Sequence, residues 1–236
     1  MKTLIIVPAF NEQGNIEMLI KRLQAFDVDI LIVNDSSTDN TSRLSHELGV
    51  KVIDLPCNLG IGGAVQTGYK YAYKYEYDCA IQIDGDGQHD PTYIESLIQP
   101  ISNSKADLVI GSRYINMEGF QSTFMRRVGI KYFSVLIRLL TKRVITDPTS
   151  GFRACNKVVI KHFAENYPVD YPEPESIVNL LRNGLTVVEL PVIMHSRQHG
   201  NSSIHSFKSV YYMIKVSIAI LIDSLRRKKS EGVLNG

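Results

Sequence analysis

Two carboxylates, Asp84 and Asp86, are the residues whose type and spacing best suit chemistry. They directly follow the apolar run Cys79–Ile83, and a short β-rich run that stops abruptly is typical of a buried strand. In an extended backbone, residues two apart point to the same side, so we expect both carboxylates at one edge of a sheet. The alternative is a polar turn, because Asp and Gly are common turn residues.

The residues around this pair favour a metal site. Gly85 and Gly87 lack Cβ atoms and leave room for a ligand to approach the backbone. Together with the amide oxygen of Gln88, the two carboxylates form an all-oxygen set that suits Mg²⁺ or Mn²⁺ and is too small for a closed calcium cage. Such a site usually shares its metal with substrate phosphates. We expect His89 to be a structural or loop group, because the oxygen set already suffices.

Polar clusters also follow two earlier predicted strands. The strand at 3–7 ends before Asn11 and Glu12, and the strand at 29–33 ends before Asp35. The alternation of strands and helices up to Asp84 predicts an α/β fold with a mainly parallel sheet. Ligands of such sheets bind at the carboxyl ends of the strands, where these clusters would meet. Their convergence indicates a nucleotide-plus-metal site.

Composition sets the limits of this interpretation. The 236 residues are 44% hydrophobic and 21% charged, which is typical of one large globular domain, with or without an appendage. Three widely spaced cysteines fit no metal pattern and indicate reduced thiols in a cytosolic protein. The basic residues lack the groove-reading motifs of nucleic-acid-binding proteins. No stretch has the 18 or so uncharged apolar residues of a membrane-spanning helix.

Two segments combine apolar and basic residues. The first, from Arg126 to Arg143, has six basic residues and no acidic one. The second, Phe207–Leu225, lies directly before the basic cluster Arg226–Lys229. Its predicted helical stripe consists of Phe207, Val210, Tyr211, Ile214, Ile218, Leu221 and Leu225. We expect a domain over residues 1–205 and an amphipathic, basic, membrane-associating tail over 206–236. The segment from Arg126 to Arg143 also suits an anionic membrane surface; in both segments the alternative is a solvated helix that packs on the domain.

Later loops also carry groups suited to anions. The segment from Asp147 to Arg153 holds one carboxylate and one guanidinium. Residues 197–203, which include Arg197, a glycine and hydroxyls, suit a phosphate. Before them, the segment from Tyr171 is expected to form a helix to Asn183 and Gly184, with the glycine as its C-cap, and residues 186–192 to form the last strand.

As a set, these motifs resemble family 2 glycosyltransferases of the GT-A fold, which has a Rossmann-like nucleotide-binding sheet. The resemblance is to the polyprenyl-phosphate branch that includes the dolichol-phosphate mannose synthases. It covers roughly residues 3 to 205, in family order. The matching segments lie at 8–12, 33–39, 58–60 with Gly68, 84–88, 111–114, 147–153 and 197–203.

The resemblance implies a role for each of these residues. The nucleotide would be held by Pro8, Ala9, Phe10, Glu12, Asp35, Asn58, Gly63, Asp84 and Gly85. The metal would be held by Asp84, Asp86 and Gln88. The catalytic set would be Asp147, Arg153, Arg113 and Arg197, and the acceptor or its phosphate would meet Arg113, Arg126, Arg197 and Ser202. Two departures stand out: Asn34 replaces a usual Asp, and Ser203 replaces the Lys common in mannose synthases.

The implied reaction is inverting and metal-dependent. A sugar would move from a nucleotide diphosphate-sugar, expected to be a UDP-sugar, to a polyprenyl phosphate such as undecaprenyl or dolichyl phosphate, for cell-surface glycan synthesis. The protein would work as a peripheral protein on the cytoplasmic face of the cell membrane, attached through its tail or through a small membrane-protein partner. Whether it forms a homo-oligomer stays open.

Three other functions remain at this stage. The acceptor could be a sugar hydroxyl of a lipid-linked glycan or polysaccharide, with Asp147 as the general base. A sugar-phosphate nucleotidyltransferase shares the α/β layout, but its glycine-rich phosphate loop is missing near the N-terminus. A non-catalytic nucleotide-sugar-binding subunit is disfavoured because the carboxylates and arginines of the site are all present.

Overall fold

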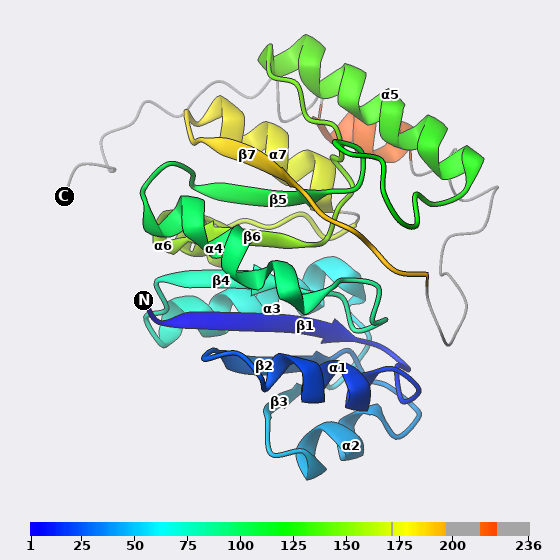
Figure 1. The fold of residues 1–236 in the computed structure, drawn as a ribbon, viewed down its shortest axis with the longest axis vertical. Coiled ribbons are helices and arrows are strands. Elements are labelled where there is room, and N and C mark those ends of the chain that lie inside the picture. The colour runs from blue at the N-terminus through cyan, green and yellow to red at the C-terminus, as the bar shows by residue number, and fades with distance from the viewer. Residues whose placement is uncertain (171, 197–212, 221–236) are drawn as a thin grey trace.

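A seven-stranded sheet forms the centre of the computed structural model, which describes residues 1–170, 172–196 and 213–220. The strand order is β3-β2-β1-β4-β6-β5-β7 (Figure 1). β6 runs antiparallel to its neighbours β4 and β5, and the other pairs are parallel. The strands are β1 (Thr3–Ala9), β2 (Asp29–Asn34), β3 (Lys51–Asp54), β4 (Cys79–Gln82), β5 (Leu108–Ser112), β6 (Arg153–Asn156) and β7 (Val187–Pro191).

Helices cover both faces of the sheet (Figure 1). The helices are α1 (Ile16–Leu23), α2 (Thr41–Glu47), α3 (Gly60–Lys74), the 3₁₀ turn η1 (Pro91–Tyr93), α4 (Ile94–Ser102), α5 (Phe124–Thr141), α6 (Lys157–Glu165) and α7 (Pro172–Arg182). In β1, Ile5 and Val7 pack on the core shared with α1 and α4, whereas Leu4 and Ile6 pack on the opposite core. This alternation is the two-residue period of a strand covered on both sides.

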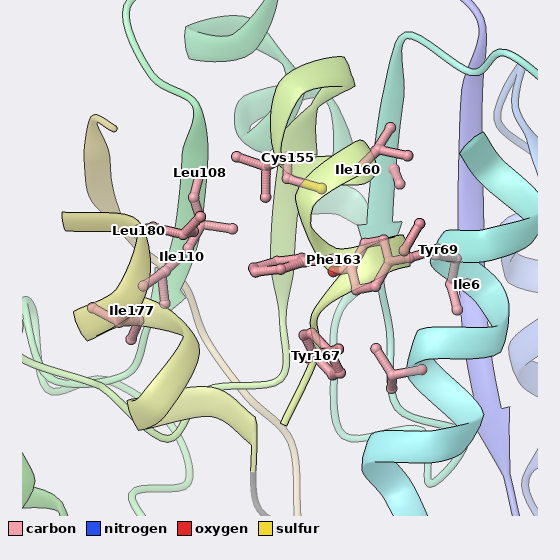
Figure 2. Close-up of a cluster of buried hydrophobic side chains, with 14 of the residues drawn as sticks. Ile6, Tyr69, Leu108, Ile110, Cys155, Ile160, Phe163, Tyr167, Ile177 and Leu180 are labelled. Atoms are coloured by element: carbon pink, nitrogen blue, oxygen red, sulfur yellow. The ribbon is translucent and has the colours of Figure 1, made fainter. Parts of the chain in front are cut away.

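The core that contains Leu4 and Ile6, called the second core below, lies between the sheet and helices α3, α5, α6 and α7. At its centre, Tyr69 of α3 packs against Phe163 of α6 and against Tyr167, with ring centroids 5.0 and 5.4 Å apart (Figure 2). Gly68 allows α3 to pack closely on β1, because a Cβ atom at this position would lie 2.2 Å from Cγ2 of Ile6. The close approach brings the middle of α3 directly against β1.

Most elements agree with the sequence predictions. The first helix buries Ile16, Leu19, Ile20 and Leu23, whose i, i+3, i+4, i+7 spacing in the sequence predicts an amphipathic helix. Gly184 follows α7 with a φ of 79°, as expected for a glycine that ends a helix. Strand β6 and helix α6 have no counterpart in the predictions. β6 is only four residues long and begins with an arginine, so it lacks the apolar run that identifies a buried strand.

The described part of the tail packs on the domain by an unexpected face. Residues 213–220 are helical, and Val216 and Ile220 lie in the second core. Ile214 and Ile218, which belong to the predicted stripe, are exposed. The remaining residues of that stripe and the cluster 226–229 lie outside the described residues. Among the described helices, none combines the length and the apolar character needed to cross a bilayer.

Candidate active site

The Asp84 carboxylate lies at the carboxyl edge of the sheet, just after β4, as predicted. Its backbone N–H donates to Nδ1 of His89 over 3.1 Å, and the side-chain amide of Gln82 donates to its Oδ1 over 3.3 Å. A Cβ atom on Gly151 would lie 2.7 Å from Oδ2 of Asp84. A side chain at position 151 would displace this carboxylate, so the glycine lets the loop after β5 and α5 approach Asp84 in its present position.

The two other predicted metal ligands lie in the same turn. Asp86 accepts the backbone N–H of Gln88 over 3.1 Å, which closes the turn. The side-chain nitrogen of Gln88 donates to the carbonyl of His195 over 3.1 Å. Gly85 lies against the end of β1, and a Cβ atom there would be 3.0 Å from the Pro8 carbonyl oxygen. The turn is thus held between the end of β1 and the segment around His195.

The donor set at this turn fits a hard divalent cation that is only partly enclosed by protein. Within the described ranges, no group of three or more His, Cys, Asp or Glu side chains is arranged to hold a metal alone. Two carboxylates leave most of an octahedral shell open, which is the usual arrangement for Mg²⁺ or Mn²⁺ bound together with substrate phosphates. Of the two glycines in this turn, Gly85 packs on the end of β1, whereas a Cβ atom on Gly87 would meet nothing within 4 Å.

The ends of β1 and β2 form the neighbouring part of the same edge. Glu12 is buried, and its backbone N–H donates to the Thr41 hydroxyl over 2.8 Å. Phe10 is exposed beside it, so its ring is accessible to a planar ligand. The backbone N–H of Asp35 donates to the carbonyl of Ala9 over 2.9 Å, which extends the pairing of β1 with β2 to the edge.

Asp35 joins this edge to the glycine-rich turn. Its two carboxylate oxygens accept the backbone N–H groups of Leu59 and Gly60 over 2.7 and 2.9 Å, at the start of α3. The negative charge is favoured there by the helix dipole, and each oxygen keeps a second lone pair for a ligand. Asn34, the departure noted in the sequence, donates to Asp54 over 2.7 Å and ties the ends of β2 and β3.

Arg113 and Asp147 form a buried, bidentate ion pair. The guanidinium Nε and Nη2 lie 2.6 and 2.7 Å from the two oxygens of Asp147, which has no solvent exposure. Burial acts to lower the pKa of Arg113, but the hydrogen bond and charge of Asp147 outweigh it and raise that pKa. Asp147 is thus engaged by a permanent cation, a placement that does not suit the general base considered above.

Glu189 was missed in the sequence, although a charged residue inside the apolar run of β7 is an unusual feature. It accepts the backbone N–H groups of Thr146 and Asp147 over 2.7 and 2.8 Å. Burial raises the pKa of Glu189, and these hydrogen bonds offset only part of that effect. The residue fixes the backbone on which the Asp147 carboxylate is mounted.

The position of Arg153 corrects the expectation that it contacts a phosphate. Its side chain is fully buried, and it donates to the carbonyls of Ser150 and Pro148 over 2.6 and 3.2 Å and to the Ser176 hydroxyl over 2.9 Å. These contacts shape the loop that carries Gly151. Arg153 is therefore a positioning residue in this structure, because its donors point to the chain and not to the open edge.

His89 has the structural position that the sequence indicated, but it lies nearer the site than expected. Its ring is buried and stacks on Phe152 with centroids 4.9 Å apart and planes 10° apart. Since Nδ1 accepts the Asp84 N–H, the neutral ring carries its proton on Nε2, which faces Oδ2 of Asp84 at 3.7 Å. His89 also forms a β-bridge with Met194, which in turn bridges Gly119.

The remaining predicted residues divide into three groups. Asn58 and Gly63 lie at the start of α3, beside Asp35, and the Asn58 amide donates to the Asp35 carbonyl over 3.3 Å. Arg126 is exposed in the first turn of α5 and has no side-chain contact with Asp84 or Asp86. Arg197 and Ser202 lie outside the described residues. The structure thus brings together the predicted nucleotide and metal residues and the Arg113–Asp147 pair.

Comparison with known sequences identifies relatives over nearly the whole chain. The profile of "Glycosyl transferase family 2" matches residues 4–163. The UDP-N-acetylglucosamine–dolichyl-phosphate N-acetylglucosaminyltransferase of Methanococcus voltae is 32% identical, over 93% of this chain and 97% of the relative. The polyprenol monophosphomannose synthase of Mycolicibacterium smegmatis is 29% identical, over 92% of this chain and 86% of the relative.

Solved structures identify the fold. Glucosyl-3-phosphoglycerate synthase from Mycobacterium tuberculosis, in complex with Mn²⁺, UDP and phosphoglyceric acid, matches with a TM-score of 0.71 at 17% identity. The match covers 94% of this chain and 78% of that chain. Together with the family profile, this likeness confirms the expected GT-A architecture. The chain belongs to glycosyl transferase family 2 and is a glycosyltransferase with the GT-A fold.

Proposed function

We propose that this glycosyltransferase moves a sugar from a UDP-sugar to a polyprenyl phosphate, with inversion at the anomeric carbon. The relatives include enzymes named for transfer to dolichyl phosphate and for polyprenol monophosphomannose synthesis, and they match almost the full chain. The observation that carries the acceptor class is the Arg113–Asp147 ion pair. It engages the carboxylate that a sugar-hydroxyl acceptor would have needed as its base.

A phosphate acceptor removes the need for that base. The second pKa of a phosphate monoester is about 6, so its oxygen is already a competent nucleophile at neutral pH. The chain then has to bind and orient two anionic substrates and keep the leaving diphosphate bound. We assign the donor diphosphate to the edge at Gly85 and Gly151, and the acceptor phosphate to the side of Arg113 and Arg197.

We place the nucleotide-sugar donor at the edge of the sheet formed by β1, β2 and β4. Asp35 and Glu12 would meet the nucleoside, with the Phe10 ring beside the base and the start of α3 near the ribose. Asp84, Asp86 and Gln88 would hold the Mg²⁺ or Mn²⁺. When bound, that ion supplies Lewis-acid stabilisation of the diphosphate leaving group. Uridine as the base rests on the donor named for the Methanococcus voltae relative.

The proposed substrates determine where in the cell the enzyme would act. A polyprenyl phosphate is confined to a bilayer, and nucleotide sugars are cytoplasmic metabolites, so we place the enzyme at the cytoplasmic face as a peripheral protein. The basic tail, a small membrane-protein partner, or both would hold it there. The product would then be a sugar-phosphate lipid that serves cell-surface glycan synthesis.

A transfer assay tests the proposal. Purified enzyme is incubated with UDP-N-acetylglucosamine, UDP-glucose or GDP-mannose, with either polyprenyl phosphate or soluble glycans, in Mg²⁺ or Mn²⁺. We expect a lipid-linked sugar phosphate only with a polyprenyl phosphate, and none in the presence of a chelator. Transfer to a glycan hydroxyl at the same rate, without lipid phosphate, would overturn the acceptor assignment.

The metal assignment has its own control. Asp86→Ala should abolish transfer and weaken Mn²⁺ binding, while Asp27→Ala, which removes an exposed carboxylate in the loop between α1 and β2, should leave both unchanged. Thermal unfolding of both variants verifies that they are folded. Full transfer by Asp86→Ala in chelator would exclude the metal from the mechanism.

A further inference from the structure

The outer side of α5 is an apolar stripe that faces solvent. Its members recur at intervals of three or four residues, the spacing that aligns side chains along one side of a helix. Their exposed fractions range from 41% for Tyr132 to 75% for Leu139. This stripe, called the outer α5 face below, consists of Phe124, Val128, Tyr132, Val135 and Leu139.

The core does not need this stripe, because α5 already has an inner apolar side. Ile130, Phe133 and Ile137 are buried, and Phe133 and Ile137 pack the helix against the second core. One apolar stripe is what a surface helix of a globular protein requires, with a polar side opposite. A second exposed stripe on the same helix is costly in water and typical of a contact surface.

Neighbouring segments extend the outer α5 face. The loop before α5 exposes Ile115, Met117 and Phe120, and residues 213–220 expose Ile214 and Ile218. The two helices are joined by a hydrogen bond of 2.9 Å between the hydroxyls of Tyr132 and Ser217. Figure 1 shows α5 along one rim of the molecule, with the orange helix of residues 213–220 behind it. Exposed apolar side chains therefore gather over three adjacent segments.

Cations line one side of the stripe. Arg127, Lys131 and Arg138 are exposed and follow the helical spacing along one border of the outer α5 face, and the exposed Lys142 follows directly after the helix. The sequence from Arg126 to Arg143 contains no acidic residue. An apolar strip flanked by unpaired positive charge matches the interface of an anionic bilayer, where acyl chains lie below phosphate groups.

We propose that the outer α5 face, with Ile214 and Ile218, rests on an anionic lipid bilayer and sets the orientation of the enzyme on it. A second copy of the chain is the competing occupant. A two-fold contact through this face would place two cationic borders together without a carboxylate on α5 to pair with them, which opposes association. Anionic headgroups attract the same border.

This orientation would bring the catalytic edge to the membrane. Gly119, in the loop before α5, bridges Met194, and Met194 bridges His89 of the metal turn. The backbone N–H of Phe120 also donates to the Met194 carbonyl over 3.0 Å. The lipid-facing loop and the Asp84–Asp86 turn are thus separated by one strand-like segment, and a lipid phosphate at the bilayer surface would lie near the carboxyl edge of the sheet. The lipid phosphate substrate in this inference is taken from the proposed function. The vesicle flotation test below does not depend on that function.

Flotation with vesicles tests the surface directly. The probe is vesicles of phosphatidylcholine with 30% phosphatidylglycerol, at low salt, with the full chain. The triple variant Val128→Gln, Val135→Gln, Leu139→Gln removes apolar surface, keeps the net charge and retains helix-forming residues. We expect its vesicle affinity to fall at least tenfold. The matched control, Met18→Gln, Tyr73→Gln, Val158→Gln, removes three exposed apolar side chains from α1, α3 and α6 and should bind as the wild type does.

The contribution of the cations beside the outer α5 face to vesicle binding has a separate test. Arg127→Gln, Lys131→Gln, Arg138→Gln should lower affinity for anionic vesicles about a hundredfold at low salt and have little effect at high salt. Lys70→Gln, Lys157→Gln, Lys161→Gln removes the same charge from α3 and α6 and should cause a smaller loss. Equal losses in the two triple variants would mean that only net charge matters, which would overturn the role of this border.

Two further readouts keep the outcomes distinct. If the apolar triple variant loses flotation but still transfers sugar to a short, water-soluble polyprenyl phosphate, the surface and the proposed function both stand. If wild-type enzyme shows no transfer to any polyprenyl phosphate, the proposed function fails, while flotation still decides the surface. Unchanged flotation of the apolar triple variant would overturn the inference. A shift from dimer to monomer in sedimentation, with unchanged flotation, would assign the face to a second copy.

Discussion

Replacing Asp147 by Asn should destabilise the whole protein, not only slow the reaction. The carboxylate has no exposure and is bonded twice to Arg113, over 2.6 and 2.7 Å. Asn cannot balance the guanidinium charge, so the variant would leave a buried cation without a counter-ion. Removing one partner of a buried pair costs about 3–5 kcal/mol. For a chain of this size each kcal/mol lowers Tm by about 2–4 °C, so Tm should fall by roughly 6–20 °C.

A double-mutant cycle separates this effect from the loss of a catalytic base. Arg113→Met alone should destabilise the protein by a similar amount, because it leaves the buried carboxylate unpaired. The double variant Arg113→Met, Asp147→Asn removes both charges, so it should be more stable than the sum of the single effects by at least about 2 kcal/mol. Urea unfolding measures all three free energies, with far-UV circular dichroism as the check on secondary structure.

The base hypothesis predicts a different result. If Asp147 takes a proton from a hydroxyl acceptor, Asp147→Asn should keep the Tm of the wild type and lose turnover almost completely. Single variants within about 2 °C of the wild type, or additive free energies in the cycle, would refute the ion-pair argument and the acceptor class derived from it.

Three further outcomes follow from contacts around the site. Gly151→Ala places a Cβ atom 2.7 Å from Asp84, so it should lower Mn²⁺ affinity and kcat at least tenfold, whereas Gly129→Ala, with 3.5 Å to its nearest neighbour, should be near neutral in both measurements. His89→Phe keeps the ring but leaves the Asp84 N–H unsatisfied at a cost of about 1–3 kcal/mol, to be measured by thermal unfolding beside Mn²⁺ titration. Burial opposes ionisation of Asp90, yet its hydrogen bonds and nearby Arg hold its pKa below the usual range. Because the folded pKa is the lower one, this stabilisation is complete above the unfolded pKa and is lost as pH falls through the folded value, so Asp90→Asn should flatten the loss of stability measured by urea unfolding below about pH 4.

The first half of the fold was predictable from sequence, because each of its elements carries a local signal. The stripe of α1 follows the helical period, β1, β2 and β4 are short continuous apolar runs, and polar residues follow directly where these strands end. The position of Asp84 and Asp86 follows from the same pattern. Local sequence is sufficient there since the sheet grows through parallel neighbours with helices between them.

The second half was less predictable, because its contacts join residues that are far apart in sequence. Nothing in the loop at 147–153 indicates that Asp147 pairs with Arg113, or that Arg153 turns inward to Ser176. The sequence alone does not distinguish an arginine whose buried guanidinium donates to backbone carbonyls from an arginine that binds a phosphate. The tail shows the same limit: within residues 213–220, Val216 and Ile220 pack on the core, whereas Ile214 and Ile218 of the predicted stripe are exposed.

The reversed strand β6 has a consequence for the order in which the chain assembles. β6 lies between β4 and β5, although it follows both in sequence. During synthesis, the β1–β4 sheet can form while β5 still has no neighbour on that side, and the gap closes only when Arg153–Asn156 leaves the ribosome. Until then, the edges of β4 and β5 are open to pairing with other chains. Because Gly151 reaches Asp84 only through the same insertion, the metal turn should be the last part of the site to acquire its native form, and any fragment that stops before residue 153 should aggregate before it can bind a substrate.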